Sequence, residues 1–205
     1  CLSGSARFFK PAYSIFLIKK WLPSIKDAVA TLTRGGSFAD IGCGFGHSTT
    51  MIAEQFSQSS VRGIDPHEKS IHEAQKIAEQ KNLNNLTYEI ASAENYSGEY
   101  DIISFFDCLH DMGDPVAAVS YAKTKLKSGG ALMIIEPYAN DEVSENFNII
   151  GQMYYSFSTI ACVPASKSQK GGMALGAQAG LKKLTNVLNN GGFSQVEMTY
   201  KTASN

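Results

Sequence analysis

One stretch decides the fold of this chain: Phe38-Ala39-Asp40-Ile41-Gly42-Cys43-Gly44-Phe45-Gly46-His47-Ser48-Thr49. It begins with a short, mostly apolar run that predicts a buried strand, and its three glycines predict a tight turn. Glycine has no Cβ, so it adopts positive φ and lets a ligand approach the backbone closely. A helix that begins after the turn directs its free N–H groups and its positive dipole end at that ligand. The stretch therefore predicts a site for a nucleotide or a carboxylate at the carboxyl end of a first strand.

The spacing of the glycines distinguishes two kinds of nucleotide site. Dinucleotide-binding folds use G-x-G-x-x-G, and the third glycine of that pattern would fall at position 47, where this chain has a histidine. Here the third glycine comes one residue earlier, as Gly42, Gly44 and Gly46, and Asp40 precedes the first by two residues. This string resembles motif I of the class I S-adenosylmethionine-dependent methyltransferases. The alternative interpretation is a turn at a strand end that binds no ligand.

The resemblance implies a Rossmann-like, doubly wound α/β fold with a mostly parallel sheet, and S-adenosylmethionine as the cofactor. The pattern along the chain agrees, because near-continuous apolar runs alternate with amphipathic helices, as in parallel sheets covered on both faces. The predicted strands span 37–41, 61–65, 86–91, 100–105, 131–136 and 193–201. The predicted helices lie at 46–57, from Pro66, from Pro115 to Gly129-Gly130, and around Leu181, Leu184 and Leu188 up to Gly191-Gly192.

The sheet of this family has a seventh, antiparallel strand after the sixth. The sequence stops at Asn205 with no segment for it and begins at Cys1 rather than at a methionine. We therefore expect a truncated last strand, unless the strand count is off by one, and a missing upstream part. Residues 1–34 predict helices, one starting at Pro23, as a remnant or linker of an upstream domain. Residues 35–205 are expected to form the methyltransferase domain, with an insertion of short helices and loops at 137–175 over the mouth of the pocket.

Composition narrows the class of protein. A length of 205 residues, with 43% hydrophobic and 18% charged residues, is typical of one globular domain with a buried core. The formal net charge of −1 argues against a large nucleic-acid footprint in this segment. The apolar run Tyr13–Ile18 is far shorter than the ~20 residues of a membrane span. The cysteines lack C-x-x-C spacing, so reduced thiols in a cytoplasmic protein are expected.

Further candidate binding residues follow the predicted strands. Asp65 ends the second strand, where an acidic side chain accepts the ribose hydroxyls of a nucleotide; a helix N-cap is the alternative, and the two roles are compatible. Ser92 stands where the family often has an aspartate, so the resemblance implies a backbone contact from Ala93 instead. The predicted cofactor-binding residues are Asp40, Gly42, Cys43, Gly44, Gly46, Asp65, Pro66, His67, Ala93, Glu94, Phe106 and Asp107.

A second informative string follows the fourth strand: Phe106-Asp107-Cys108-Leu109-His110-Asp111-Met112-Gly113-Asp114-Pro115. With Ile135-Glu136-Pro137, Pro164-Ala165-Ser166 and Leu175–Gly180, it resembles one subgroup of these methyltransferases, in which a winged-helix-like region precedes the methyltransferase domain. The resemblance covers nearly the whole chain from about residue 21. In this topology the string adjoins the first strand, so it is expected to face the cofactor's methionine moiety and methyl group.

His110 is the predicted catalytic residue, as a general base or as a group that orients the substrate. Methyl transfer from a sulfonium is an in-line displacement, for which the enzyme mainly supplies alignment, and histidine titrates near neutrality. The alternative is a histidine hydrogen-bonded within its loop to Asp107 or Asp111. The predicted substrate residues are Glu136, Phe147, Tyr154 and Tyr155. No His, Asp and Cys set has metal-ligand spacing, so no catalytic metal is predicted.

Together these features predict a methyltransferase that acts on a small molecule, with O-methylation of an aromatic or apolar substrate as the expected reaction. A homodimer is compatible with this prediction, and a membrane or nucleic-acid partner for this segment is not expected. Two alternatives stay open. The chain could be the cofactor-binding sensor domain of a winged-helix transcriptional regulator, or a nicotinamide-dependent reductase, against which His47 argues.

Overall fold

The computed structural model describes residues 2–202, which divide into two compact units. The first unit extends to Phe106 and also contains Lys125–Ile134, and the second consists of Asp107–Thr124 and the residues from Ile135 onward. Among these residues, no helix combines the length and the apolar character that crossing a membrane requires.

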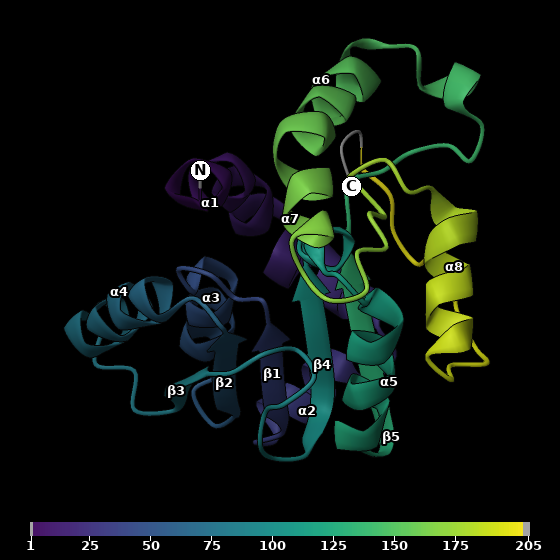
Figure 1. The fold of residues 1–205 in the computed structure, drawn as a ribbon. Helices are drawn as coiled ribbons and strands as arrows, with labels where there is room; N and C mark the ends of the chain where they lie inside the picture. Colours follow the sequence, from purple (N-terminus) through teal and green to yellow (C-terminus); the bar gives the residue numbers. More distant parts are fainter. Residues whose placement is uncertain (1, 203–205) are drawn as a thin grey trace. The chain divides into compact units, whose positions relative to one another are not determined.

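The first unit is built on a five-stranded sheet with the strand order β3-β2-β1-β4-β5 (Figure 1). The strands are β1 (Ser37–Ile41), β2 (Ser60–Asp65), β3 (Leu86–Ile90), β4 (Tyr100–Phe106) and β5 (Leu126–Ile135). β1 pairs in parallel with β2 and β4, and β2 pairs in parallel with β3. The carboxyl end of β1 therefore lies between two neighbours at the point where the strand order reverses, where doubly wound sheets bind their ligands. The predicted Rossmann-like fold is confirmed.

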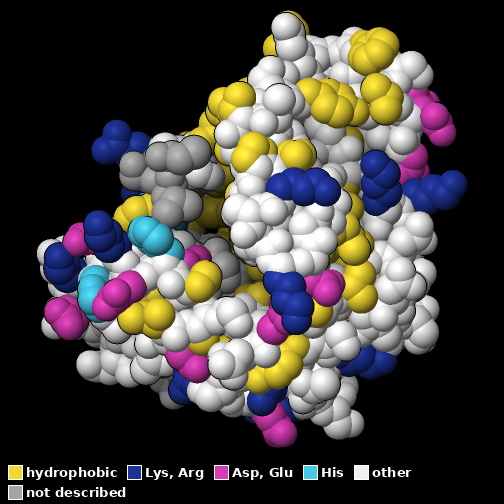
Figure 2. All heavy atoms as spheres, in the orientation of Figure 1, with side chains coloured by type: hydrophobic (Ala, Val, Ile, Leu, Met, Phe, Trp, Pro, Cys, Tyr) yellow, Lys and Arg dark blue, Asp and Glu magenta, His cyan; other side chains and the backbone are white. Residues whose placement is uncertain are grey.

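Two helices of the first unit pack on the sheet. α3 (His47–Gln55) contacts β1, β2 and β3, and α4 (Glu68–Gln80) contacts β2 and β3. α4 buries Ile71, Ala74 and Ala78 on one face. Its outer face carries charged and histidine side chains, which are visible in Figure 2.

The N-terminal segment is helical, as predicted. It comprises α1 (Leu2–Ala12), the π-helical η1 (Tyr13–Trp21), the 3₁₀ turn η2 (Leu22–Ser24) and α2 (Ala28–Thr33). In η1, Tyr13, Leu17 and Trp21 are buried. The predicted helix start at Pro23 is wrong. Pro23 lies in the short η2 turn, Ile25 is extended, and Asp27 has φ 60°, so α2 begins only at Ala28.

The second unit is mostly helical. Its elements are η3 (Leu109–Asp111), α5 (Pro115–Lys125), η4 (Val143–Asn146), α6 (Ile149–Phe157), η5 (Ser158–Cys162), α7 (Val163–Lys167) and α8 (Leu181–Asn190). Asp114 is the N-cap of α5, because its Oδ1 accepts from Ala117 N at 2.9 Å. Residues 137–175 form short helices and loops, as predicted. Hydrophobic side chains gather on the face over α6 in Figure 2. Phe147 and Ile149, before and at the start of α6, are 80% and 82% exposed.

The predicted boundary between α5 and β5 is wrong, and so is the predicted sixth strand. α5 ends at Lys125, and β5 starts at Leu126 with Gly129, at φ 78°, inside it. The predicted sixth strand is absent from 193–202, where the structure shows no strand. A segment becomes a strand only by pairing with a neighbour, and none of the five described strands pairs with this one.

The packing of Gly63 generates a stability prediction. A Cβ on Gly63 would lie 2.5 Å from the Tyr88 ring and 2.9 Å from Cys43 Sγ. We expect Gly63→Ala to lower the free energy of unfolding by about 1–3 kcal/mol through overpacking, measured by urea denaturation. The control is Gly4→Ala in α1, where nothing lies within 4 Å, and where alanine should stabilise by up to about 1 kcal/mol. Equal stability of Gly63→Ala and the wild type would contradict this packing.

Candidate functional site

A glycine loop, residues 42–46, joins β1 to α3. Gly42, Gly44 and Gly46 have φ values of 72°, 51° and 69°, in the left-handed region that glycine adopts without strain. The N–H groups of Gly42 and Cys43 both donate to the carbonyl of Ile64, at 2.8 and 3.1 Å. The loop is therefore tied to the end of β2 at its start.

The carboxylate of Asp40 holds the other side of this loop. Its Oδ2 accepts from Ser48 Oγ at 2.6 Å and from Thr49 Oγ1 at 2.7 Å, both in the first turn of α3. Its Oδ1 accepts from Ser104 Oγ of β4 at 3.2 Å. Burial raises the pKa of Asp40 to about 6, although the three hydroxyls oppose that shift. Asp40 is fully buried, so the geometry favours a positioning role over the predicted direct contact with a cofactor.

Asp65 connects the loop to the start of α4. Its Oδ2 accepts from Gly44 N at 2.9 Å, and its Oδ1 accepts from His67 N at 2.8 Å. A carboxylate has about four lone-pair sites, so Asp65 keeps acceptor capacity for hydroxyl groups of a ligand. The N-cap of α4 is His67, whose Nδ1 lies 2.8 Å from Ser70 Oγ and accepts from Ser70 N at 3.3 Å. Pro66 and His67 are exposed, and their predicted adenine contacts stay predictions.

Three glycines near the loop differ in the space around them, and the difference shows where a ligand fits. A Cβ on Gly46 would lie 2.2 Å from the Tyr88 hydroxyl, and one on Gly63 would meet the same ring. Nothing lies within 4 Å of the Cβ position of Gly44. Gly46 and Gly63 are therefore required for packing, whereas Gly44 faces open space that a cofactor can approach. The sequence analysis missed Tyr88, whose role depends on its register in β3 opposite Gly63.

The remaining predicted cofactor residues differ in exposure. Ala93 is half-buried and Glu94 is exposed, in the loop after β3. Phe106 ends β4, is 5% exposed, and its ring centroid lies 6.0 Å from that of Tyr13 in η1. Asp107 opens the second unit with φ 49° and donates from its N–H to the Ile135 carbonyl at 2.8 Å. A positive φ on a residue other than glycine costs energy and is frequent at functional sites. The roles of these four residues stay predictions.

In the second unit, His110 lies at the centre of a buried polar cluster, which we call the His110 cluster: His110, Asp111, Glu136 and Cys162. His110 Nδ1 makes a close contact with Glu136 Oε2, and both side chains are about 4% exposed. Glu136 Oε1 accepts from the N–H groups of Leu109 and His110, at 2.9 and 3.3 Å. On the other side of the ring, Nε2 lies 3.3 Å from Asp111 Oδ1.

The cluster determines the charge of His110. Burial alone would lower the pKa of the ring, but the Glu136 carboxylate, helped by Cys162 and Asp111, holds the pKa well above its usual range. The cluster therefore favours the protonated form of the ring. Glu136, a predicted substrate residue, is the hydrogen-bond partner of His110, and its substrate role stays a prediction. The predicted alternative partner Asp111 also lies beside the ring.

The other predicted substrate residues separate into two environments. Tyr154 of α6 is only 2% exposed. Phe147 and Tyr155 line a pocket of about 520 Å³, together with Asn146, Asn148, Ile149 and Gln152. Phe147 and Tyr155 therefore line the same pocket, whereas the side chain of Tyr154 is buried.

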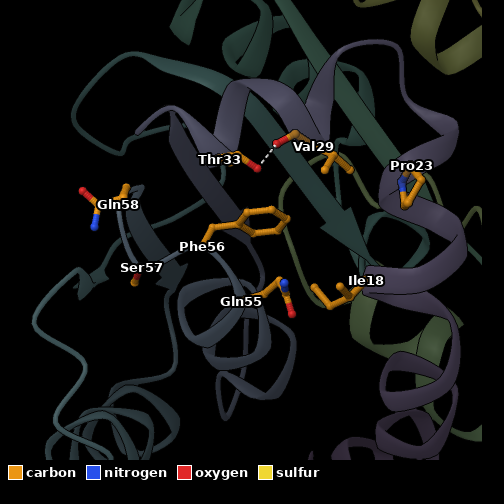
Figure 3. A pocket seen from close by; sticks show the side chains of 8 residues that line it. All are labelled: Ile18, Pro23, Val29, Thr33, Gln55, Phe56, Ser57 and Gln58. Atoms are coloured by element: carbon orange, nitrogen blue, oxygen red, sulfur yellow. Dashed lines mark hydrogen bonds between the residues drawn. The ribbon is translucent and has the colours of Figure 1, made fainter.

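A pocket of about 380 Å³ in the first unit lies at the C-terminal end of α3 (Figure 3). Its lining is Ile18, Pro23, Val29, Thr33, Gln55, Phe56, Ser57 and Gln58. The glycine loop is at the N-terminal end of the same helix, which is nine residues long, and hence about 13 Å away. The lining offers no charged side chain, so the glycine loop remains the candidate cofactor site.

Comparison with known proteins gives a consistent result. A family model described as a methyltransferase domain matches residues 32–192. Ubiquinone biosynthesis O-methyltransferase of Acinetobacter baylyi is 28% identical over 153 residues, which cover 71% of this chain and 60% of that protein. This chain thus spans about 60% of the length of the curated relatives it matches first.

Two solved structures share the fold. The structure of PigF with SAH has a TM-score of 0.72 at 16% identity, covering 99% of this chain and 55% of that one. Human N-acetylserotonin methyltransferase in complex with SAM has a TM-score of 0.66 at 14% identity, covering 97% of this chain and 53% of that one.

The buried carboxyl of Asp40 predicts a pH dependence of stability. Because burial raises its pKa from 3.8 to about 6, the folded state binds more protons than the unfolded state between these pH values. Stability from this group is therefore present at low pH and is lost as pH rises through about 6, by about 3 kcal/mol in total.

The measurement is the difference in free energy of unfolding between the wild type and Asp40→Asn, from urea denaturation at pH 4 to 7 without ligand. The difference should shift in favour of the variant by about 3 kcal/mol as pH rises. Taking the difference removes the contributions of the other carboxyl groups. A difference that does not change with pH would contradict the assignment.

Proposed function

Since this chain belongs to the family of methyltransferase domains, we propose that it transfers the methyl group of S-adenosylmethionine to a hydroxyl oxygen of a small aromatic or apolar molecule. The observation that carries the proposal is the open face of Gly44 next to the half-buried carboxylate of Asp65. The O-methyltransferase name of the Acinetobacter baylyi relative supports oxygen as the acceptor atom.

Groups of the first unit support binding of this cofactor. Asp65 would accept the ribose hydroxyls with its remaining lone pairs, and the backbone at Gly44 would allow the close approach. Ala93, Glu94 and the start of α4 would receive the adenine, and Phe106 the methionine end. When bound, S-adenosylmethionine supplies a methyl group activated by a positively charged sulfur. The task of the protein is then to align an acceptor with it.

His110 supplies the electrostatics for that acceptor. A neutral imidazole accepts a proton, whereas an imidazolium donates a hydrogen bond and stabilises negative charge. Because Glu136 raises the pKa of His110, the ring acts from Nε2 as a donor that orients the acceptor and favours its ionised form. Of the two predicted roles of His110, the geometry thus favours orienting the substrate over acting as a general base. An orienting donor suits phenols, which ionise more readily than aliphatic alcohols.

The direct test is a methyl-transfer assay with methyl-labelled S-adenosylmethionine and three matched acceptor sets: simple phenols, aliphatic alcohols and carboxylic acids. Labelled product from phenols and not from alcohols supports the proposal. Transfer only to carboxylic acids would contradict the acceptor class. Cofactor binding with no transfer to any set would instead favour the sensor alternative.

Two variants separate cofactor binding from chemistry, and each is the control of the other. Asp65→Ala removes the ribose acceptor, so we expect its affinity for S-adenosylmethionine to fall about 10–100-fold. His110→Ala should keep that affinity and lower kcat about 100-fold or more, because it loses the donor to the acceptor oxygen.

Affinities are measured by calorimetry and rates with the phenol that the assay identifies. Circular dichroism spectra confirm that both variants fold. The assignments are wrong if Asp65→Ala binds the cofactor normally or if His110→Ala loses cofactor binding together with activity.

A further inference from the structure

We propose that His110, Asp111 and Cys162 form a binding site for a thiophilic divalent cation such as Zn²⁺, and that the bound cation blocks methyl transfer. Cation binding is independent of the proposed function, whereas the inhibition rests on it. The sequence predicted no metal, because no His, Asp and Cys set has ligand spacing. Cys162 lies 52 positions after His110 in the chain, so only the fold reveals the set.

The ligand atoms are already close together. One ligand atom from each of His110, Asp111 and Cys162 lies within 4.8 Å of the other two. His110 Nε2 lies 3.3 Å from Asp111 Oδ1. Zinc bonds of about 2.0–2.3 Å in a tetrahedron place neighbouring ligand atoms about 3.3–3.8 Å apart. The set therefore needs shifts of about 1 Å or less to close around a cation. Imidazole, carboxylate and thiolate are the ligands that zinc prefers.

Glu136 completes the environment that a metal-binding histidine requires. Such a histidine almost always hydrogen-bonds a carboxylate or carbonyl through its second ring nitrogen, which fixes the tautomer and the ring orientation. Here Glu136 binds Nδ1 and is itself fixed by the N–H groups of Leu109 and His110. Nε2 is therefore the nitrogen available for a metal, and it is the one that faces Asp111.

Asp111 provides an independent indication. Its Oδ1 is buried and has no hydrogen-bond partner among the described residues. A buried carboxylate oxygen without a hydrogen bond is costly. A cation that replaces the Nε2 proton of His110 would be bound by both Nε2 and this oxygen. The Asp111 side chain is 43% exposed overall, so the cluster can be reached from solvent on this side.

The backbone around the cluster is fixed by hydrogen bonds within the second unit. Ser166 Oγ of α7 donates to the Met112 carbonyl at 2.7 Å, and Gln169 Nε2 donates to the Asp111 carbonyl at 2.9 Å. These bonds attach η3, which carries His110 and Asp111, to the segment that follows Cys162. A site built on restrained elements holds its ligands in place before the cation binds.

Three protein ligands leave the fourth position of a tetrahedral ion open. When the cation binds, the Cys162 thiol and Nε2 of the protonated His110 ring each give a proton to the buffer. The cation then occupies His110 Nε2, the atom from which His110 orients the acceptor, so methylation stops. Removal of the cation by a chelator restores the free ring.

The experiment is a calorimetric titration of the untagged chain with Zn²⁺, in a thiol-free reductant and without cofactor or acceptor. We expect one ion per chain. Co²⁺ in place of Zn²⁺ should give a sulfur-to-cobalt charge-transfer band, which reports the thiolate directly. Cys162→Ser should abolish that band, and both Cys162→Ser and Asp111→Asn should weaken Zn²⁺ binding more than tenfold, since even loss of an outer-shell partner costs about 10–100-fold.

The matched controls are Cys108→Ser in the same unit and His72→Gln on the exposed face of α4, and both should bind as the wild type does. Thermal denaturation of each metal-free variant confirms folding. The site is wrong if Cys162→Ser and Asp111→Asn bind Zn²⁺ normally, or if the cobalt band persists in Cys162→Ser.

Inhibition is a separate readout. Zn²⁺ should lower the rate of the wild type and of Cys108→Ser at the concentration that saturates the calorimetric site, and a chelator should reverse the effect. If Zn²⁺ binds the three residues and methylation continues, the inhibitory role is overturned while the metal site stands. If no methylation occurs without Zn²⁺, the proposed function fails and the binding result is unaffected.

Discussion

The carboxylate of Asp40 joins three elements of the first unit, and the candidate cofactor site depends on that junction. It lies fully buried at the centre of the sheet, where it accepts hydroxyls from α3 and β4. Removing a carboxyl from water is costly, and the raised pKa of Asp40 shows that three hydroxyl donors offset only part of this cost. These hydrogen bonds fix the first turn of α3 against β1 and β4.

Once that turn is fixed, the other contacts of the loop follow. Gly42 and Cys43 bond to the end of β2, and Gly44 bonds to Asp65 at the end of the same strand. Tyr88 fills the space that Gly46 and Gly63 leave open. The result is a restrained backbone with one open face, at Gly44. In the second unit, Glu136 plays a comparable part, because it holds both the ring and the backbone N–H of His110.

The sequence predicted features that are encoded locally. The glycine turn and β1 each depend on neighbouring residues, and the structure has both. Pairings between distant residues were not predictable in this way. Glu136 was expected to face a substrate, and nothing local shows that it binds His110, 26 positions earlier. The prediction of a strand at 193–201 is wrong for the same reason, because strand formation depends on a partner strand. The predicted upstream winged-helix region, homodimer and cytoplasmic location stay predictions.

The central claim is that the glycine loop selects S-adenosylmethionine over a dinucleotide. The most direct measurement is a calorimetric titration of the wild-type chain with S-adenosylhomocysteine, and in parallel with NADH under the same conditions. The account predicts saturable binding of one S-adenosylhomocysteine per chain and no heat of binding with NADH. Saturable binding of NADH, with none of S-adenosylhomocysteine, would contradict it.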